Sequence, residues 1–506
     1  MASAERMSSK QIEIPRFTDI KEPQVVALAS SARAGTKILQ SFLDNHDHIL
    51  MIPGYPLMYL YPHWKSWHCQ FYNNLSWKRF IDIFCEKHAS VLDSRKVAGL
   101  SGLERLGQEH NEYVRIDENL FRKALKTLLS GLPVCRKTFL LAVHYAYAIC
   151  KGEDINAKTV LFYHIHYPLY LKELSEDFPD LKVINMIRNP LASMHSTLRS
   201  NRIVGDSKLN ETDSIIYTGR NYRLTSQLHY DTLDHLSSSL REGQIISIRM
   251  ESMYGNKEFV MRNLAQWLDV EFSETMLQST FDGKLWWGDI TNRKPVNDLD
   301  PKAVTDKWKQ SINSIDAFVI EGVSFQLYKR YHYEPILYKQ DNTWNRLLLF
   351  PAILIPNKAE WQSLLYYFHP RTHLKVLQAA LVESTGSIPL KDYTWNATYL
   401  YKWFYLDLQL WRVRWYDRFV SNHSLRDMQT ANAAVFHPMN ILYICAKYGL
   451  LWTAILTFPK QIVKRYCIFY RYLWRRLNGH AFLPPLLEEK QKKNASMITK
   501  SLIGLQ

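Results

Sequence analysis

Cysteine is scarce in this sequence of 506 residues. Six cysteines are present, widely spaced and without a C-x-x-C pair. We therefore expect neither a disulfide framework nor a zinc or redox site built from paired cysteines. The first 21 residues contain no apolar run, so neither a secretory signal nor an N-terminal membrane anchor is expected. These absences predict a cytoplasmic protein in a reduced compartment.

Acidic residues are few relative to basic ones. The chain has 63 Lys+Arg and 48 Asp+Glu, a formal net charge of +15, which favours an anionic partner. Between residues 402 and 480, twelve lysines and arginines stand against three aspartates, so +9 of the charge lies there. Eight of the fifteen tryptophans lie between Trp344 and Trp474. We expect a boundary near residues 335–345. The expected divisions are a polar segment (1–22), a first domain (23–340) and a basic, aromatic, mainly helical region (341–506).

Long apolar runs are scarce as well. Ile441–Phe458 has eighteen residues of apolar character with Lys447 inside it, whereas a bilayer-spanning helix needs about 20. The residues that follow mix cations with aromatic side chains, as interfacial helices at anionic headgroups do. Three interpretations stay open for this run: peripheral membrane contact through 402–480, a buried helix, or a span. Single-stranded nucleic acid also suits such a composition, but the nearly balanced charge of the first two thirds of the chain argues against nucleic acid as the main partner.

Short apolar runs alternate with helical patterns in the first two thirds of the chain. Val25–Ser30 is typical of a strand buried on both faces, and Thr36–Asn45 of a helix. This alternation predicts an α/β fold, a parallel sheet with flanking helices. Residues 64–155 lack strong strand signals and predict a helical insertion. Further expected strands are Val160–His164, Val183–Ile187 and Ile245–Ile248, and further expected helices are Trp77–Leu92 and Asn119–Leu129.

Ligands of such sheets bind beyond the carboxyl ends of the strands, and the first turn at that edge is Ser30–Lys37. It has small residues and two cations between a strand and a helix. Backbone N–H groups and a helix N-terminus can converge there on an anion, and Gly35 permits close approach. A Walker pattern would need Gly at position 30 and Lys-[Ser/Thr] at 36 and 37; the sequence has Ser, Thr and Lys there. Nucleoside triphosphate hydrolysis is therefore not expected.

The second turn at that edge follows Ile187. Arg188 ends the expected strand, Asn189 suits a helix cap and Pro190 suits the first helical position, which places Ser196 nearly two turns into the helix. Arg188 and Ser196 can then hold one phosphate together. Taken alone, Arg188 is equally compatible with a bridge to a surface carboxylate.

Together the two turns resemble the signature of sulfotransferases that use 3′-phosphoadenosine 5′-phosphosulfate (PAPS). SSARAGTKILQSFLDNH is similar to that family's 5′-phosphosulfate loop. FPDLKVINMIRNPLASMHS is similar to its 3′-phosphate segment, in a form close to the tyrosylprotein and related bacterial branches. Ile245–Leu268, and Lys294–Asn297 followed by Trp308, are similar to two later segments. Four segments in order over residues 23–335 identify the chain as a member of this family, with a P-loop NTPase-like sulfotransferase fold.

The resemblance implies roles for individual residues. The first turn should hold the 5′-phosphosulfate, Arg188 and Ser196 the 3′-phosphate, and Lys294 another part of the cofactor, without a metal. We expect Arg33 and Lys37 to act catalytically by stabilising charge on the leaving oxygen, as positioned cations do in phosphoryl transfer. The expected cofactor-binding residues are Ser31, Ala32, Arg33, Ala34, Gly35, Thr36, Lys37, Arg188, Ser196 and Lys294.

The general base of the family pattern is missing. Gly54 occupies the position of a glutamate in the tyrosylprotein branch, and Tyr163 that of a frequent lysine. His164 and His166 alternate along the expected strand and should share one face. An imidazole, with a pKa of about 6.5, can accept a proton at neutral pH, so both are candidate catalytic residues and His63 is a further one. Hydrogen-bonded, partly buried histidines are an equally good interpretation.

The expected function is therefore transfer of a sulfonyl group from PAPS to a hydroxyl on a glycan or glycolipid, releasing 3′-phosphoadenosine 5′-phosphate (PAP). The enzyme is expected at the inner face of a membrane, bound to its anionic surface through residues 402–480. Because the base positions are altered, the alternative is a catalytically impaired nucleotide-binding or membrane scaffold protein of the same fold.

Overall fold

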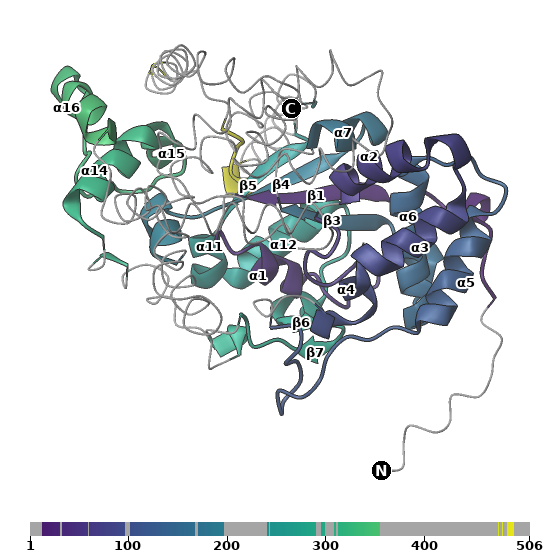
Figure 1. Ribbon diagram of the computed structural model, residues 1–506. Helices are drawn as coiled ribbons and strands as arrows, with labels where there is room; N and C mark the ends of the chain where they lie inside the picture. The colour runs from purple at the N-terminus through teal and green to yellow at the C-terminus, as the bar shows by residue number, and fades with distance from the viewer. Residues whose placement is uncertain are drawn as a thin grey trace, which may run out of the picture.

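The computed structural model describes most of the first two thirds of the chain and short parts of the remainder, and the thin grey trace in Figure 1 marks the other residues. The fold is given for the described residues alone. These are 13–30, 33–58, 60–96, 102–166, 171–196, 240–241, 243–289, 295–298, 308–309, 312–354, 474, 478 and 483–489.

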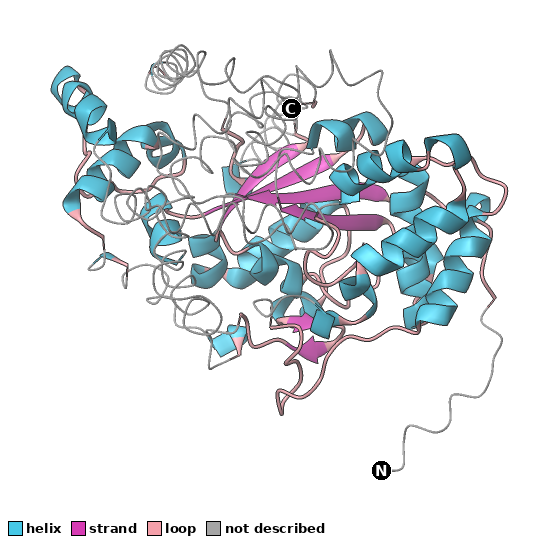
Figure 2. Cartoon of the chain, viewed as in Figure 1, coloured by secondary structure: helices cyan, strands magenta, loops and turns pink. Residues whose placement is uncertain are grey.

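A five-stranded parallel sheet lies at the centre of the molecule, between helices (Figure 2). Its strand order is β2-β3-β1-β4-β5. The sheet and four of its strands confirm the sequence prediction; β2 was not predicted, because three residues carry too short a pattern. The strands are β1 (Gln24–Ser30), β2 (Ile49–Met51), β3 (Val160–His166), β4 (Lys182–Ile187) and β5 (Ile245–Arg249).

The central strand β1 is buried along almost its whole length. It pairs with β3 on one side and β4 on the other, so that Val26 lies opposite Phe162 and Lys182. Val26, like the next three residues, is fully buried. Burial on both faces explains the continuous apolar run, since neither face of such a strand meets water. The polar turn that follows β1 is thereby fixed at the carboxyl edge of the sheet.

The interval after β2 is helical, as predicted. The expected helix Trp77–Leu92 is divided at His88 into α3 and α4, and the helix expected at Thr36–Asn45 ends earlier, at Phe42. Aromatic side chains join these helices: the rings of Trp64 and Phe80 lie 4.4 Å apart. The helices up to β4 are α1 (Thr36–Phe42), α2 (Leu60–Gln70), α3 (Trp77–Lys87), α4 (Ala89–Leu92), α5 (Glu118–Leu129), α6 (Arg136–Lys151) and α7 (Leu171–Asp177).

Beyond β5 the described chain continues mainly as helices. A small antiparallel pair, β6 (Thr280–Phe281) with β7 (Lys284–Leu285), interrupts them. Residues 483–489 return to the sheet, where Ser247 N donates to Pro485 O at 2.8 Å. The later helices are α11 (Met250–Gly255), α12 (Lys257–Leu268), α14 (Ser314–Val323), α15 (Phe325–Arg330) and α16 (Thr343–Leu354).

The expected membrane segment cannot be compared with this structure. Residues 441–458 lie outside the described part, as does all of 402–480 except residues 474 and 478. None of the helices in the described part is long and apolar enough to cross a bilayer. The boundary near 335–345 likewise stays a prediction.

Candidate functional site

Three segments from distant parts of the sequence meet at the carboxyl edge of the sheet. They are the turn after β1, the turn after β4, and the residues that follow β7, ending at Asp289. Two of the three were predicted from the sequence. Ser31, Ala32 and Lys294, which the sequence also predicted here, lie outside the described residues.

The turn after β1 has an unusual backbone. Arg33 and Gly35 both have positive φ, 63° and 86°, a region that favours glycine. Helix α1 begins directly after it at Thr36, and the N–H groups of Ile38 and Leu39 donate to Gly35 O. A Cβ at position 35 would lie 3.0 Å from Cγ and Sδ of Met250, at the start of α11. Glycine is therefore required at 35 by backbone conformation and by packing.

We expect Gly35→Ala to lower the free energy of unfolding by roughly 1–2 kcal/mol from the left-handed backbone alone, with the contact to Met250 adding to this. Urea unfolding measures the effect. Gly255→Ala is the matched control, because no atom lies within 4 Å of its added Cβ and its φ is not positive. Equal stability of the two variants would contradict this account of the turn.

Arg33 links all three segments. Its Nε donates to Ser196 Oγ at 3.2 Å, and its Nη2 forms an ion pair with Asp289 Oδ2 at 2.8 Å. Arg188 Nη1 donates to the carbonyl oxygen of Arg33 at 3.3 Å. The predicted residues Arg33, Arg188 and Ser196 thus lie together. Asp289 was not predicted, because it lies 256 residues from Arg33 and has no local motif.

Polar atoms at this edge have unused hydrogen-bonding capacity. Arg188 Nε and Ser30 Oγ are buried and have no hydrogen-bond partner among the described residues. Burial lowers the pKa of Arg188; the Glu251 carboxylate opposes this shift and the Arg33 cation adds to it. Buried polar groups in native proteins nearly always have partners. An anion at this place would supply one to Arg188 and would offset the repulsion between the two guanidinium groups.

The turn after β4 is held rigidly. Asn189 caps the helical residues 190–196, since its Oδ1 accepts from Leu191 N at 3.0 Å, which confirms the predicted cap. Glu251 accepts from Asn189 N and from the Tyr333 hydroxyl, both at 2.9 Å. These bonds fix the backbone directly after Arg188, so little conformational entropy is lost when its guanidinium binds a ligand.

Lys37 lies in the first turn of α1, with its Nζ 5.6 Å from the centre of the Tyr55 ring. Burial lowers the pKa of Lys37 to about 8. The Asp289 carboxylate opposes the shift, Arg33 adds to it, and Glu104 opposes it. The ammonium group is therefore largely charged at pH 7 and only weakly solvated, which strengthens its attraction for an anion.

The candidate histidines have different surroundings. His164 is buried; its Nδ1–H donates to Gln40 Oε1 at 3.2 Å, and its ring meets Tyr55 edge to face at 5.3 Å. The pairing of β1 with β3 shifts register before Ala29, which pairs with His166. The prediction that His164 and His166 share one face assumed that side chains alternate regularly along β3. The register shift interrupts this alternation. The side chain of His166 lies outside the described residues.

His63 forms a pair with a second histidine. His88 Nδ1 donates to Pro56 O at 2.8 Å, so its Nε2 accepts from His63 Nδ1 at 3.1 Å. Burial lowers the pKa of His63 to about 4 and that of His88 to about 3. Both are neutral at pH 7. Within the described residues, no group of three His, Cys, Asp or Glu side chains is placed to hold a metal ion.

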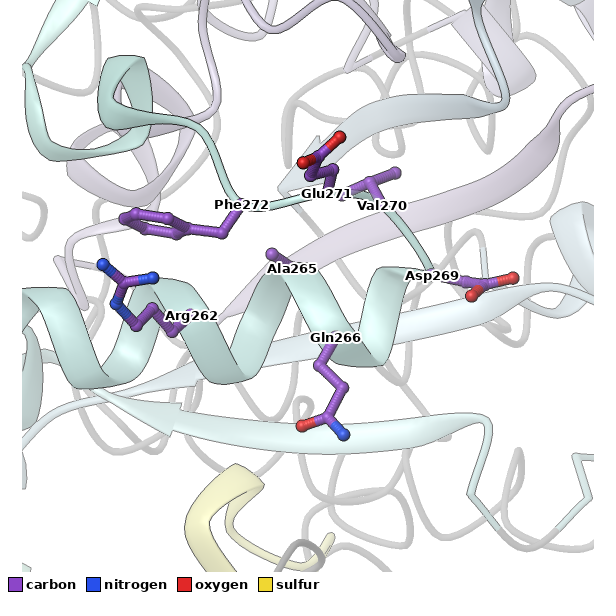
Figure 3. A pocket seen from close by; sticks show the side chains of 7 residues that line it. All are labelled: Arg262, Ala265, Gln266, Asp269, Val270, Glu271 and Phe272. Carbon is purple, nitrogen blue, oxygen red and sulfur yellow. The ribbon is translucent and has the colours of Figure 1, made fainter.

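A shallow hollow of about 540 Å³ lies elsewhere, at the carboxyl end of α12 (Figure 3). Lys182, the first residue of β4, donates to Trp267 O there, so the hollow is at the amino edge of the sheet. Its one arginine, Arg262, pairs with Glu258 and stacks on Phe272. The hollow does not suit a phosphate. Its lining residues are Arg262, Ala265, Gln266, Asp269, Val270, Glu271 and Phe272.

Known structures resemble this chain at low sequence identity. A sulfotransferase domain from the Synechococcus PCC 7002 olefin synthase is 15% identical, with 60% of this chain and 92% of that chain covered and a TM-score of 0.33. A sulfotransferase from Alicyclobacillus acidocaldarius is 13% identical, with 65% and 100% covered and a TM-score of 0.31. No curated protein matches the sequence.

The sequence profile of the sulfotransferase family matches residues 26–274. This range contains the five strands, the turn with Arg33 and Lys37, and the turn with Arg188 and Ser196. Residues 26–274 of the chain thus belong to the sulfotransferase family of enzymes, and the family implies PAPS as its sulfonyl donor.

Proposed function

We propose that this enzyme transfers the sulfonyl group of PAPS to a hydroxyl of a glycan or glycolipid and releases PAP. The observation that carries the proposal is the convergence of Arg33, Arg188 and Ser196, with a buried Arg188 Nε that has no partner in the described part of the chain. PAP carries phosphates at both ends of its ribose. Two groups of anion-binding residues, one in each turn, suit such a ligand.

The two turns have separate proposed roles. Arg188 and Ser196 hold the 3′-phosphate, and residues 31–37 hold the 5′-phosphosulfate. Lys37 stabilises the negative charge that develops on the phosphate oxygen when its bond to sulfur breaks, as preorganised cations do in related transfers. Because these cations supply the positive charge, we expect no metal. Lys294 remains a proposed contact to the donor.

The proposal of a glycolipid acceptor is based on features of the C-terminal part of the chain. Trp344, Leu347 and Leu348 are 75%, 56% and 59% exposed on α16, and their spacing puts them on one helix face. This helix lies at the outer edge of the molecule (Figure 1). This exposed Trp/Leu face and, separately, the strongly basic composition of residues 402–480 support contact with an anionic membrane. A glycolipid hydroxyl would be presented there.

Incubation of the enzyme with sulfur-labelled PAPS and glycolipids in phosphatidylserine-containing vesicles tests the proposal. We expect label in the lipid fraction, and less with neutral vesicles. Binding of PAP without transfer to any glycan or glycolipid would favour the catalytically impaired alternative. Absence of PAP binding would overturn both.

The lowered pKa of Lys37 predicts that binding of the nucleotide depends on pH. Its ammonium is charged below its pKa of about 8, and a bound phosphate raises that pKa. The affinity for PAP should therefore fall about twofold between pH 7 and pH 8 and roughly tenfold by pH 9. Isothermal titration calorimetry measures this. In Lys37→Arg the cation stays charged, and we expect a flat profile. A wild-type profile that is also flat would show that Lys37 does not contact the nucleotide.

A further inference from the structure

The transfer proposed above requires a group that takes the proton of the acceptor hydroxyl, and this inference rests on that proposed function. Two carboxylates act electrostatically on the Lys37 ammonium, those of Asp289 and Glu104. Geometry places both beside the turn that carries Lys37, since Asp289 pairs with Arg33 of that turn and Arg105, the residue after Glu104, donates to the backbone oxygen of Asp289.

The carboxylate of Asp289 already has a cationic partner. Its carboxylate is neutralised by Arg33 at 2.8 Å, and its backbone oxygen accepts from Arg105 Nη2 at 3.4 Å. A carboxylate in an ion pair is a weaker proton acceptor. Glu104 is paired more loosely than Asp289. Its Oε1 forms an ion pair with Arg105 Nε at 3.9 Å, too long for a hydrogen bond, and its Oε2 is buried and has no hydrogen-bond partner among the described residues.

The loop that carries Glu104 is firmly docked. Gly107 N donates to Leu285 O at 2.9 Å, and Trp287 Nε1 donates to Gly107 O at 2.8 Å. At the other end, Gly102 has a φ of 67° and lies so close to Gly288 that a Cβ would overlap the carbonyl oxygen of Gly288. The position of Glu104 is therefore set by the backbone on both sides.

Packing brings this loop to the carboxyl edge of the sheet, where PAPS is proposed to bind. A Cβ at Gly54 would lie 2.9 Å from Leu103 Cδ1, so residue 103 fills the space where a side chain at 54 would be. The next residue after Gly54 is Tyr55, whose ring lies beneath Lys37. Glu104 thus follows a residue that packs beside the Lys37–Tyr55 pair.

A buried carboxylate oxygen without a donor is costly, and a hydroxyl group of the acceptor would satisfy it. We propose that Glu104 is the general base of the transfer. The proton of the acceptor hydroxyl passes to Glu104 Oε2, and the acceptor oxygen forms a bond to sulfur. The bond between sulfur and the 5′-phosphate oxygen breaks, and its electron pair stays on that oxygen, near Lys37.

The test compares acceptors that differ in their need for a base. Octyl β-glucoside and water have weakly acidic hydroxyls, whereas p-nitrophenol ionises by itself near neutral pH. In Glu104→Gln, transfer to the glucoside and donor hydrolysis should fall by about 10²–10⁴-fold, while transfer to p-nitrophenol changes by only a few fold. The Kd for PAP and the melting temperature should equal those of the wild type.

Glu109→Gln is the control, since Glu109 is an exposed carboxylate of the same loop; it should behave as wild type with every acceptor. The role of Glu104 is overturned if the two variants match, or if Glu104→Gln loses transfer to all acceptors and PAP binding together. A wild-type enzyme that neither binds PAP nor consumes PAPS would instead overturn the proposed function itself.

Discussion

Replacing Arg188 by alanine should weaken PAP binding by about 10²-fold, because loss of one partner of a buried charged pair costs about 3 kcal/mol. Arg188 Nε has no partner among the described residues, and the 3′-phosphate is the group proposed to bind it. AMP lacks that phosphate. Its affinity should therefore change by less than about threefold, and the preference for PAP over AMP should disappear. Calorimetry with both nucleotides measures this difference.

The control for this prediction is Arg241→Ala, which removes an arginine whose side chain is 79% exposed. It should bind both nucleotides as the wild type does. A parallel loss of PAP and AMP affinity in Arg188→Ala would indicate damage to the fold. Unchanged PAP affinity would show that the 3′-phosphate binds elsewhere.

Replacing Lys37 by methionine should lower kcat by about 10²–10³-fold, the effect seen when one preorganised group is removed from a developing charge. Methionine keeps the length and apolar stem of the side chain, so its packing near Tyr55 is preserved. The Kd for PAPS at pH 7 should rise much less than kcat falls, because the charge on the leaving oxygen is absent in bound PAPS and develops in the transition state.

Steady-state kinetics with PAPS and a hydroxyl acceptor separate these effects. Lys126→Met, an exposed lysine of α5, is the control and should leave kcat unchanged. If Lys37→Met raised Kd and left kcat at the wild-type value, Lys37 would bind the donor and take no part in the transfer.

Much of the donor side of this site was predictable from the sequence. Strands buried on both faces leave continuous apolar runs, so β1 and β4 were found, and the turns that follow them contain Arg33 and Arg188. The cap at Asn189 also follows from local preference. The contact between Arg33 and Ser196 was not predicted, since the path of a long side chain depends on the tertiary structure.

The acceptor side was less predictable. Glu104 and Asp289 reach the site through a loop contact between Gly102 and Gly288, which are 186 positions apart and follow no periodic pattern. A signal was present in hindsight: glycines at both positions permit a backbone approach that other residues would block. The argument for a shared face of His164 and His166 assumed a regular strand, and the register shift before Ala29 interrupts that regularity, so the shared face stays a prediction.

The structure shows where some of the cations behind the net charge of +15 lie. Three of its cations, Arg33, Lys37 and Arg188, are concentrated at one edge of the sheet. Burial is the main cause of the lowered pKa values of Lys37 and Arg188, and the charge of Arg33 adds to it. Such mutual repulsion opposes folding unless an anion relieves it. Nucleotide binding should therefore stabilise the fold as well as position the donor.

A crystal structure of the enzyme with PAP tests the central claim most directly. We predict the 3′-phosphate within hydrogen-bond distance of Arg188 Nε and Ser196 Oγ, and the 5′-phosphate over the N-terminus of α1 beside Lys37. Nucleotide bound at the hollow beside α12, or density at the sheet edge with Arg188 Nε still unpartnered, would contradict the account.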